Sequence, residues 1–153
     1  MGGRRLILLR HAQAGERGSH HPDRERPLSA EGLRQARDLV NTIGPLGPRR
    51  ILSSPYTRCL QTVEPLARAN GVKVEAIDDL GEGGRPIRLL KRLDDWDGVL
   101  MCSHGDELAE LVSHFVGLGA PLEEALPIRK GAAWVLKIVK GKVVRGRYVP
   151  PPG

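Results

Sequence analysis

Cysteine and aromatic residues are scarce in this chain of 153 residues. Its two cysteines, Cys59 and Cys102, are too few and too far apart for a zinc knuckle. Neither has an arginine six residues later, so the Cys-x5-Arg loop of cysteine phosphatases is absent, and both are predicted to be reduced, packed thiols. Aromatic residues make up 3% of the chain, which argues against a protein that stacks single-stranded nucleic-acid bases.

Long hydrophobic runs are also missing. No apolar stretch approaches the roughly 18 residues typical of a membrane-spanning helix. Met1-Gly2-Gly3-Arg4-Arg5 passes directly into a short apolar run, which leaves no room for a signal peptide. These two absences predict a cytoplasmic protein without a membrane partner.

The charge balance is basic, with a formal net charge of +6 and a pI near 9.8. Such a balance favours anionic partners. The lysines and arginines are scattered rather than clustered in runs, so small phosphorylated molecules fit this charge as well as nucleic acid does. An apolar content of 40% with 27% charged residues is ordinary for a globular domain.

Apolar runs of strand length alternate with helix-like segments along most of the chain. Helices are predicted to begin at the N-caps Ser29 and Ser54, the first with Leu33 on its apolar face, because apolar residues recur there at helical spacing. Two more helices are predicted in the same way over 87–96 and 106–116. Strands are predicted over 6–9, 50–53, 72–77, 98–103, 132–139 and 142–149, the last two forming a hairpin around Lys140-Gly141. We therefore expect a three-layer α/β/α sandwich with a mostly parallel central sheet and a C-terminal hairpin, in one domain over 1–149 with a tail at 150–153.

The first predicted strand ends in two cationic side chains. Leu6-Ile7-Leu8-Leu9 is continuously apolar, as expected of a strand buried on both faces, and Arg10-His11 follow it directly. In open α/β sheets, ligands bind just beyond the carboxyl ends of the strands. Arg10 and His11 are therefore candidate ligand-binding residues.

Two further candidates occupy equivalent positions. Arg58 comes early in the helix after the second strand, and His104 follows the fourth strand. If these strands are parallel neighbours, the two side chains converge with Arg10 and His11 on one crevice. Arginine forks suit phosphate oxygens, and their field keeps a nearby histidine unprotonated and nucleophilic. A histidine can then hold a phosphoryl group covalently, so the set needs no metal or other cofactor.

Four motifs, in this order, resemble the histidine phosphatase superfamily, whose fold is phosphoglycerate mutase-like. They cover residues 6 to about 116 and are Leu9-Arg10-His11-Ala12, Leu28-Ser29-Ala30-Glu31-Gly32 with Gln35-Ala36, Ser53-Ser54-Pro55 with Arg58, Gln61 and Thr62, and Ser103-His104-Gly105. The resemblance implies a metal-independent phosphatase with His11 as phosphoryl acceptor and Arg10, Arg58 and His104 as the phosphate pocket. The family usually has glycine where this chain has Ala12, so a methyl group is expected to narrow the space beside the nucleophile.

Chain length and the C-terminal segment point to different substrates. The size is similar to that of small SixA-like phosphohistidine phosphatases, which implies a phosphorylated protein. Lys130-Gly131-Ala132-Ala133-Trp134 and Arg147-Tyr148-Val149-Pro150 instead resemble the phosphatase domain that follows a Nudix hydrolase in some bacterial enzymes, which implies a nucleotide. Phosphohistidine, nucleotide and sugar phosphate all remain open as substrates, and the oligomeric state is not predicted.

The resemblance also implies a proton donor for the leaving group. In the superfamily this acid commonly comes from the loop after the third strand, and Asp79-Leu80-Gly81-Glu82 matches that segment. Glu82 is therefore the candidate general acid. Asp106 and Glu107, next to His104, are alternatives.

Two other functions fit parts of the sequence. A non-catalytic module that binds a phosphate or nucleotide would use Arg10, Arg58 and His104 without a nucleophile at His11. Asp95-Trp96-Asp97-Gly98 imitates the signature of haloacid-dehalogenase phosphatases, with Asp95 as nucleophile. That signature follows a hydrophobic strand, whereas the residues before Asp95 have helical spacing, so the histidine-based reading is favoured.

Overall fold

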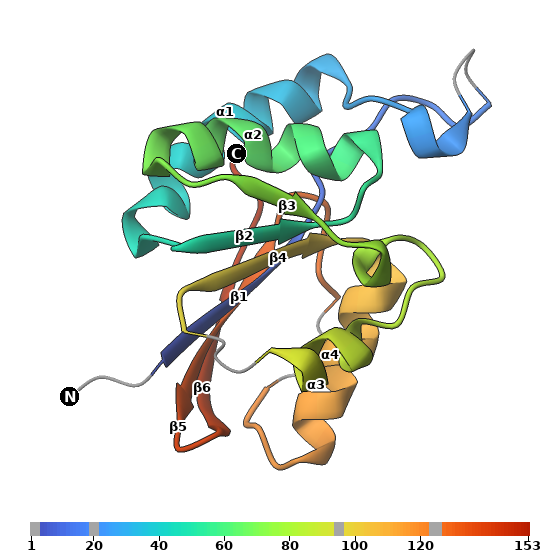
Figure 1. Ribbon diagram of the computed structural model, residues 1–153. Helices are drawn as coiled ribbons and strands as arrows, with labels where there is room; N and C mark the ends of the chain where they lie inside the picture. The colour runs from blue at the N-terminus through green and yellow to red at the C-terminus, as the bar shows by residue number, and fades with distance from the viewer. Residues whose placement is uncertain (1–3, 19–21, 94–96, 123–126) are drawn as a thin grey trace.

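A computed structural model describes residues 4–18, 22–93, 97–122 and 127–153 (Figure 1). The strands are β1 (Arg4–Arg10), β2 (Arg50–Ser53), β3 (Val74–Ala76), β4 (Val99–Ser103), β5 (Ala133–Val139) and β6 (Lys142–Val149). The α-helices are α1 (Ala30–Thr42), α2 (Thr57–Asn70), α3 (Pro86–Arg92) and α4 (Gly105–Gly117), and short 3₁₀ turns lie at Asp23–Glu25, Gly44–Leu46 and Asp78–Leu80.

The strands form one sheet in the order β3-β2-β4-β1-β5-β6. The first four of these run parallel to their neighbours, while β5 is antiparallel to β1 and β6 is antiparallel to β5. The predicted mostly parallel sheet with a closing hairpin is therefore confirmed. Lys140 and Gly141 both have positive φ, at 51° and 77°, as the tight turn between two hairpin strands requires.

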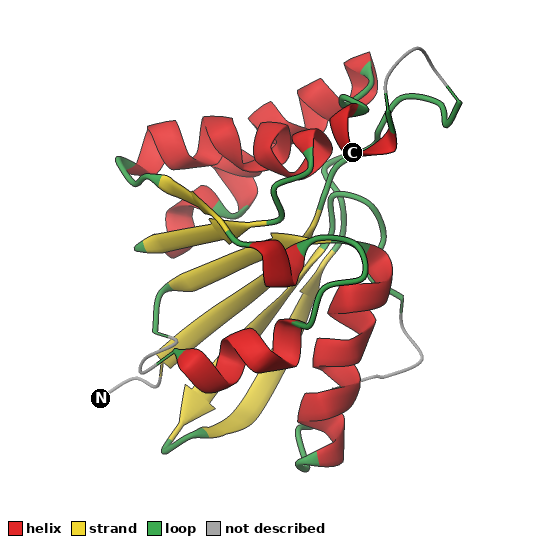
Figure 2. Cartoon of the chain, turned by 45° about the vertical axis from the view of Figure 1, so that its right-hand side comes forward, coloured by secondary structure: helices red, strands yellow, loops and turns green. Residues whose placement is uncertain are grey.

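Helices cover both faces of this sheet, α1 and α2 on one face and α3 and α4 on the other (Figures 1 and 2). The apolar residues of β1 pack against both helical layers because successive side chains of a strand point to opposite faces of the sheet. Leu6 and Leu8 pack in the cluster that contains Phe115 of α4, and Ile7 and Leu9 pack in the cluster that contains residues of α1 and α2. The α/β/α sandwich is thus held by two cores, one on each face of the sheet, and β1, β2, β4 and β5 contribute side chains to both.

Several predicted boundaries and one predicted core residue were wrong. Leu33 is 41% exposed, because α1 turns Gly32, Gln35, Ala36 and Leu39 inward instead. Helix α2 begins at Thr57, not at Pro55, since the Ser54 hydroxyl bonds the amide of Tyr56. Strand β3 is shorter than the predicted 72–77. Helix α3 ends at Arg92, and the predicted end of this helix, residue 96, lies outside the described residues.

The carboxyl ends of β1, β4 and β2 lie side by side. The His11 amide donates to the Ser103 carbonyl at 3.1 Å, and the Ser54 amide donates to the Cys102 carbonyl at 2.9 Å. These bonds extend the parallel pairing beyond the last strand residues. The chain thus leaves all three strands at one edge of the sheet, as predicted.

The C-terminal residues and the cysteines complete this description. The carbonyl of Gly153 accepts a hydrogen bond from Arg34 of α1, so the end of the segment 150–153 lies against that helix. Cys59 and Cys102 are free and buried, as predicted for packed thiols. In the described part of the chain, no helix combines the length and apolar character needed to cross a membrane.

Candidate active site

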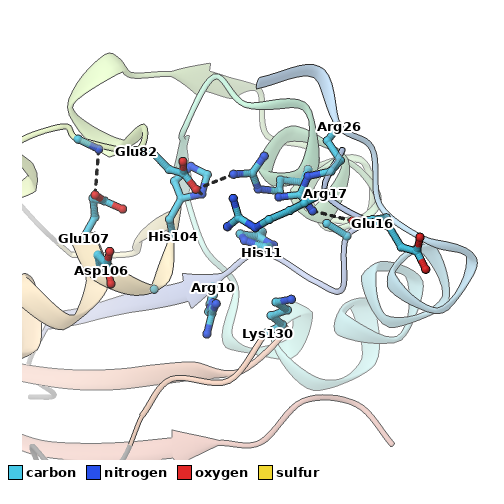
Figure 3. Close-up of a pocket in the computed structure, with 15 residues that line it drawn as sticks. Arg10, His11, Glu16, Arg17, Arg26, Glu82, His104, Asp106, Glu107 and Lys130 are labelled. Atoms are coloured by element: carbon cyan, nitrogen blue, oxygen red, sulfur yellow. Dashed lines mark hydrogen bonds and ion pairs between the residues drawn. The ribbon is translucent and has the colours of Figure 1, made fainter. Parts of the chain in front are cut away.

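A cavity of about 660 Å³ opens at the edge where β1, β2 and β4 end (Figure 3). All of the predicted site residues line it: Arg10, His11, Arg58, Glu82 and His104. The alternative acids Asp106 and Glu107 line it as well. Among these predicted residues, the structure brings together side chains that are up to 97 positions apart in the sequence, Arg10 and Glu107 being the extremes.

The His11 ring is held in one tautomer. Its Nδ1 lies 2.7 Å from the carbonyl oxygen of Ala12. A carbonyl oxygen can only accept, so Nδ1 carries the proton and Nε2 is the unprotonated nitrogen. An imidazole in this state has a lone pair available at Nε2, which suits a nucleophile.

The segment after His11 is fixed by the second and third sequence motifs. The Ala12 amide donates to the Thr62 hydroxyl at 2.9 Å, and the Gln13 amide donates to the Gln35 side chain at 3.0 Å. The Gln13 carbonyl accepts from the amide of Ser29, which also caps α1 as predicted. Motif residues that never touch the cavity thus position the nucleophile.

The methyl group of Ala12 does not narrow the pocket, contrary to expectation. Ala12 is fully buried and forms a small cluster with Leu28 and Ala36. Its carbonyl oxygen accepts the hydrogen bond from the His11 ring, and Ala12 is not among the residues that line the cavity. Alanine is accommodated at this position because its methyl group fills the space between the His11 segment and α1.

Arg58 is the most buried charge of the site, with 1% of its side chain exposed. Its guanidinium donates to Glu82 Oε1 at 2.7 Å and to the Asp23 carbonyl at 2.8 Å, and it lies 5.0 Å from the centre of the Tyr56 ring. Its Nε has no hydrogen-bond partner among the described residues. A buried donor without a partner, in a cavity, is a ready contact for a ligand oxygen.

His104 faces His11 edge-on, with 5.4 Å between the ring centres. Its Nε2 lies 2.9 Å from the Ser54 hydroxyl and 3.7 Å from the Cys59 sulfur. Its Nδ1 is buried, has no hydrogen-bond partner among the described residues, and lies 3.7 Å from Glu82 Oε1. A hydrogen bond donated by Ser54 to Nε2 leaves the proton on Nδ1, where it can be donated to a ligand.

Arg10 and the acidic residues of α4 complete the wall. Arg10 donates to the Ile128 carbonyl at 3.0 Å, and its Nε is another buried donor with no partner in the described part of the chain. Glu107 is 7% exposed and accepts from the amide of Gly83 at 3.0 Å, so it holds the loop that carries Glu82. Asp106 lines the cavity next to Gly105.

Burial lowers the pKa of His11 from 6.5 to about 3. Unfavourable electrostatic interactions with His104, Arg58 and Arg10 add to this decrease, while the hydrogen bond to Ala12 opposes it. The sequence pointed to the arginine field as the reason for an unprotonated histidine, but burial is the larger cause. In either case the His11 ring is neutral at physiological pH.

This depressed pKa makes the free energy of unfolding depend on pH. Unfolded His11 binds a proton near pH 6.5, whereas folded His11 does so near pH 3, so stability falls as the pH drops through this window. Between about pH 7.5 and pH 5, the wild type should lose about 2 kcal/mol more unfolding free energy than His11→Gln. Urea denaturation at both pH values measures this difference, and parallel losses in the two proteins would contradict it.

Sequence reasoning missed several residues of the site. Arg17, Arg26 and Lys130 line the cavity, and Asp23 bonds Arg58 from the loop before α1. No periodicity marks which residues of the polar loop over 16–27 turn inward. Arg26 is one of them, and the fold leaves it only 5% exposed.

Comparison with known proteins identifies the family. Residues 6–85, which are 80 of the 153 residues, match the model of the histidine phosphatase superfamily, branch 1. The chain belongs to the histidine phosphatase superfamily. The match includes His11, Arg58 and Glu82 and therefore confirms the resemblance stated from the motifs.

One curated relative is the 8-oxo-(d)GTP phosphatase of Mycolicibacterium smegmatis, 28% identical over 155 aligned positions. The alignment covers 96% of this chain and 48% of the relative, so the chain spans about half the length of that protein. A yeast relative, the 55 kDa subunit of transcription factor tau of Saccharomyces cerevisiae, is 35% identical over 43% of this chain and 16% of its own length.

Solved structures of this superfamily share the fold. The SixA protein of Agrobacterium tumefaciens has a TM-score of 0.75 and 22% identity, with 96% of this chain and 99% of that chain covered. A mycobacterial glucosyl-3-phosphoglycerate phosphatase in complex with VO₃ has a TM-score of 0.71 and 20% identity, with 95% and 97% covered. The predicted phosphoglycerate mutase-like architecture is confirmed. Asp95, the nucleophile predicted for the alternative phosphatase family, lies outside the described residues.

Proposed function

We propose that this histidine phosphatase domain hydrolyses a phosphomonoester or a phosphohistidine through a covalent intermediate on His11. The observation that carries the proposal is the His11 ring, whose Nδ1 is bonded to the Ala12 carbonyl and whose Nε2 is left unprotonated in a cationic cavity. Arg10, Arg58 and His104 line the same cavity, and each has a buried nitrogen without a hydrogen-bond partner among the described residues. A non-catalytic module would need such donors but would have no use for a fixed nucleophilic tautomer.

In the first step, Nε2 of His11 attacks phosphorus and a new N–P bond forms. The bond that breaks joins phosphorus to the leaving atom, which is an oxygen in a phosphomonoester and an imidazole nitrogen in a phosphohistidine. Arg10 and Arg58 hold the phosphoryl oxygens through charge-assisted hydrogen bonds. His104 donates to the same oxygens, where negative charge accumulates. In the second step, water attacks the phosphohistidine, which releases phosphate and restores His11.

Glu82 is the proposed proton donor for the leaving oxygen. Its carboxylate lies between Arg58, at 2.7 Å, and Nδ1 of His104, at 3.7 Å. A bound phosphate competes with Glu82 for Arg58, and its negative charge disfavours a second negative charge on the carboxylate. Substrate binding thus favours the protonated acid, which transfers its proton as the bond to phosphorus breaks and then accepts one from water in the second step.

The Glu82→Gln variant tests this role. General acid catalysis is worth about 100- to 10,000-fold and matters most for poor leaving groups. We therefore expect turnover of an alkyl phosphate to fall by at least about 100-fold, and turnover of p-nitrophenyl phosphate or phosphohistidine to change far less. Steady-state kinetics on all three substrates checks this, with circular dichroism as the folding control. Equal slowing of all three would transfer the role to Asp106 or to Glu107.

The activity itself is tested on a panel of phosphohistidine peptide, nucleotides and sugar phosphates, with excess chelator present. Within the described ranges, no three His, Cys, Asp or Glu side chains gather as metal ligands, and two arginines already face the phosphate position. We expect phosphate release from at least one class, undiminished by the chelator. A strict requirement for Mg²⁺ would instead favour the aspartate-based mechanism, and binding without turnover would favour the non-catalytic module.

A further inference from the structure

Most of the charges around His11 are divided between two sides of the cavity. In Figure 3, three carboxylates lie on the side of His104: Glu82, Asp106 and Glu107. Three cations lie on the opposite side of His11, where the carboxylate Glu16 also lies: Arg17, Arg26 and Lys130. The mechanism above uses the first side and leaves the cations of the second side without a role.

Lys130 is placed against the nucleophile by its backbone. The amide of the next residue, Gly131, donates to the carbonyls of His11 at 2.9 Å and Arg10 at 3.2 Å. Gly131 has a φ of +83°, a conformation that glycine adopts without strain. The base of the lysine is thus fixed to the end of β1, and its side chain extends into the cavity.

In the described part of the chain, the charged groups that act most strongly on the ammonium group of Lys130 are all cations. No carboxylate there is within ion-pair distance of it. Burial lowers its pKa, and the charges of Arg10, Arg26, Arg17 and Arg58 lower it further. A lysine held among arginines is electrostatically unfavourable until an anion enters.

The two arginines on this side differ in whether their guanidinium groups already bond other residues of the protein. Arg26 is 5% exposed and already bonds Asp23 and, at 2.7 Å, the Gly15 carbonyl. Arg17 is 76% exposed, and its one ion pair with a described residue is a distant contact of 3.8 Å to Asp23. Arg26 therefore orders the loop and adds positive potential, whereas Arg17 has free donors for a ligand.

We propose that Lys130 and Arg17 form a second anion subsite, which binds an additional anionic group on the substrate beyond the phosphoryl group that is transferred. This inference rests on the proposed function, because Arg10, Arg58 and His104 are assigned there to the transferred group. The ligand class is an organic phosphate that carries a second phosphate or a carboxylate. A simple monoester such as p-nitrophenyl phosphate leaves this subsite empty.

Binding of three small phosphonates tests the subsite, since the C–P bond resists hydrolysis. Methylphosphonate has one anionic group, methylenediphosphonate has two, and phosphonoacetate has a phosphonate and a carboxylate. By isothermal titration calorimetry, the wild type should bind at least one of the two larger ligands about 10-fold more tightly than methylphosphonate. Which one it prefers tells whether the second group is a phosphate or a carboxylate.

Two substitutions should remove this preference. In Lys130→Met and Arg17→Met, the ratio of Kd for methylphosphonate to Kd for the preferred larger ligand should fall to about 3-fold or less. Kd for methylphosphonate itself should change little. Lys142→Met, an exposed lysine of β6 outside the cavity, is the matched control and should keep the wild-type ratio. Equal binding of all three phosphonates by the wild type, or an unchanged ratio in both variants, overturns the subsite.

Turnover separates this inference from the proposed function. Lys130→Met should lower kcat/KM for a doubly anionic substrate about 10-fold and leave kcat/KM for p-nitrophenyl phosphate nearly unchanged. Phosphonate selectivity without turnover of any phosphate would overturn the proposed function and leave the subsite standing. Turnover of a phosphate without phosphonate selectivity would support the proposed function and overturn the subsite.

Discussion

Replacement of His11 by alanine is expected to lower turnover by about 10⁴-fold or more, because a nucleophile that forms a covalent intermediate has no substitute in the site. The neighbouring donors would still bind phosphate, so Kd for inorganic phosphate should change much less than kcat. With ³²P-labelled substrate, an acid-free quench of the wild type should trap a protein adduct that is labile to acid and stable to base. His11→Ala should form no such adduct.

The matched control is His114→Ala, which removes a histidine of α4 whose ring packs against Phe115, outside the cavity. This variant should retain wild-type turnover and the labelled adduct. If His11→Ala kept the turnover of the wild type, the covalent mechanism would be wrong. If the adduct persisted in His11→Ala but disappeared in His104→Ala, the nucleophile would be the second histidine.

Gly32→Ala is expected to destabilise the protein by about 3 kcal/mol and to impair catalysis from outside the cavity. A β-carbon at Gly32 would lie 1.9 Å from the carbonyl oxygen of Gln13 and 2.9 Å from its carbonyl carbon. These are backbone atoms, so the segment that carries His11 must move away from α1. A displacement of about 1 Å at a reacting group can cost about 100-fold in rate, so kcat should fall in the protein that remains folded.

Gly117→Ala provides the comparison, since Gly117 also lies in an α-helix and an added β-carbon there meets no atom within 4 Å. Alanine at such a position should be neutral or stabilising by about 0.5–1 kcal/mol, with normal kcat. Thermal unfolding and steady-state kinetics of both variants check the contrast. Similar behaviour of the two would show that the contact between Gly32 and Gln13 is not what fixes the His11 segment.

The fold was predictable where a local pattern has one physical solution. The apolar run of β1 can be buried on both faces only between two helical layers. The prediction that His11 and His104 meet depended on β1 and β4 being parallel neighbours, and the structure shows that they are. The residues of the reaction could therefore be named from the sequence.

Chain segments without periodicity were decided by tertiary contacts alone. Nothing local in the sequence indicates that Asp23 bonds Arg58 or that Lys130 lies beside His11, because these depend on how two loops close over the strand ends. Ser54 was expected to cap a helix, yet its hydroxyl reaches His104. Each of these contacts joins residues far apart in the chain, and only the packed structure brings them within bonding distance.

The sequence by itself thus determined the sheet, the strand-end histidines and arginines, and the family. The tertiary structure decided the state of those residues. Burial, which no residue pattern quantifies, lowers the pKa of His11 to about 3, and a carbonyl of the adjacent residue fixes its tautomer. The types of the reacting residues can be read from short motifs in the sequence. Their protonation depends on burial, and their neighbours depend on tertiary packing, so both require the folded structure.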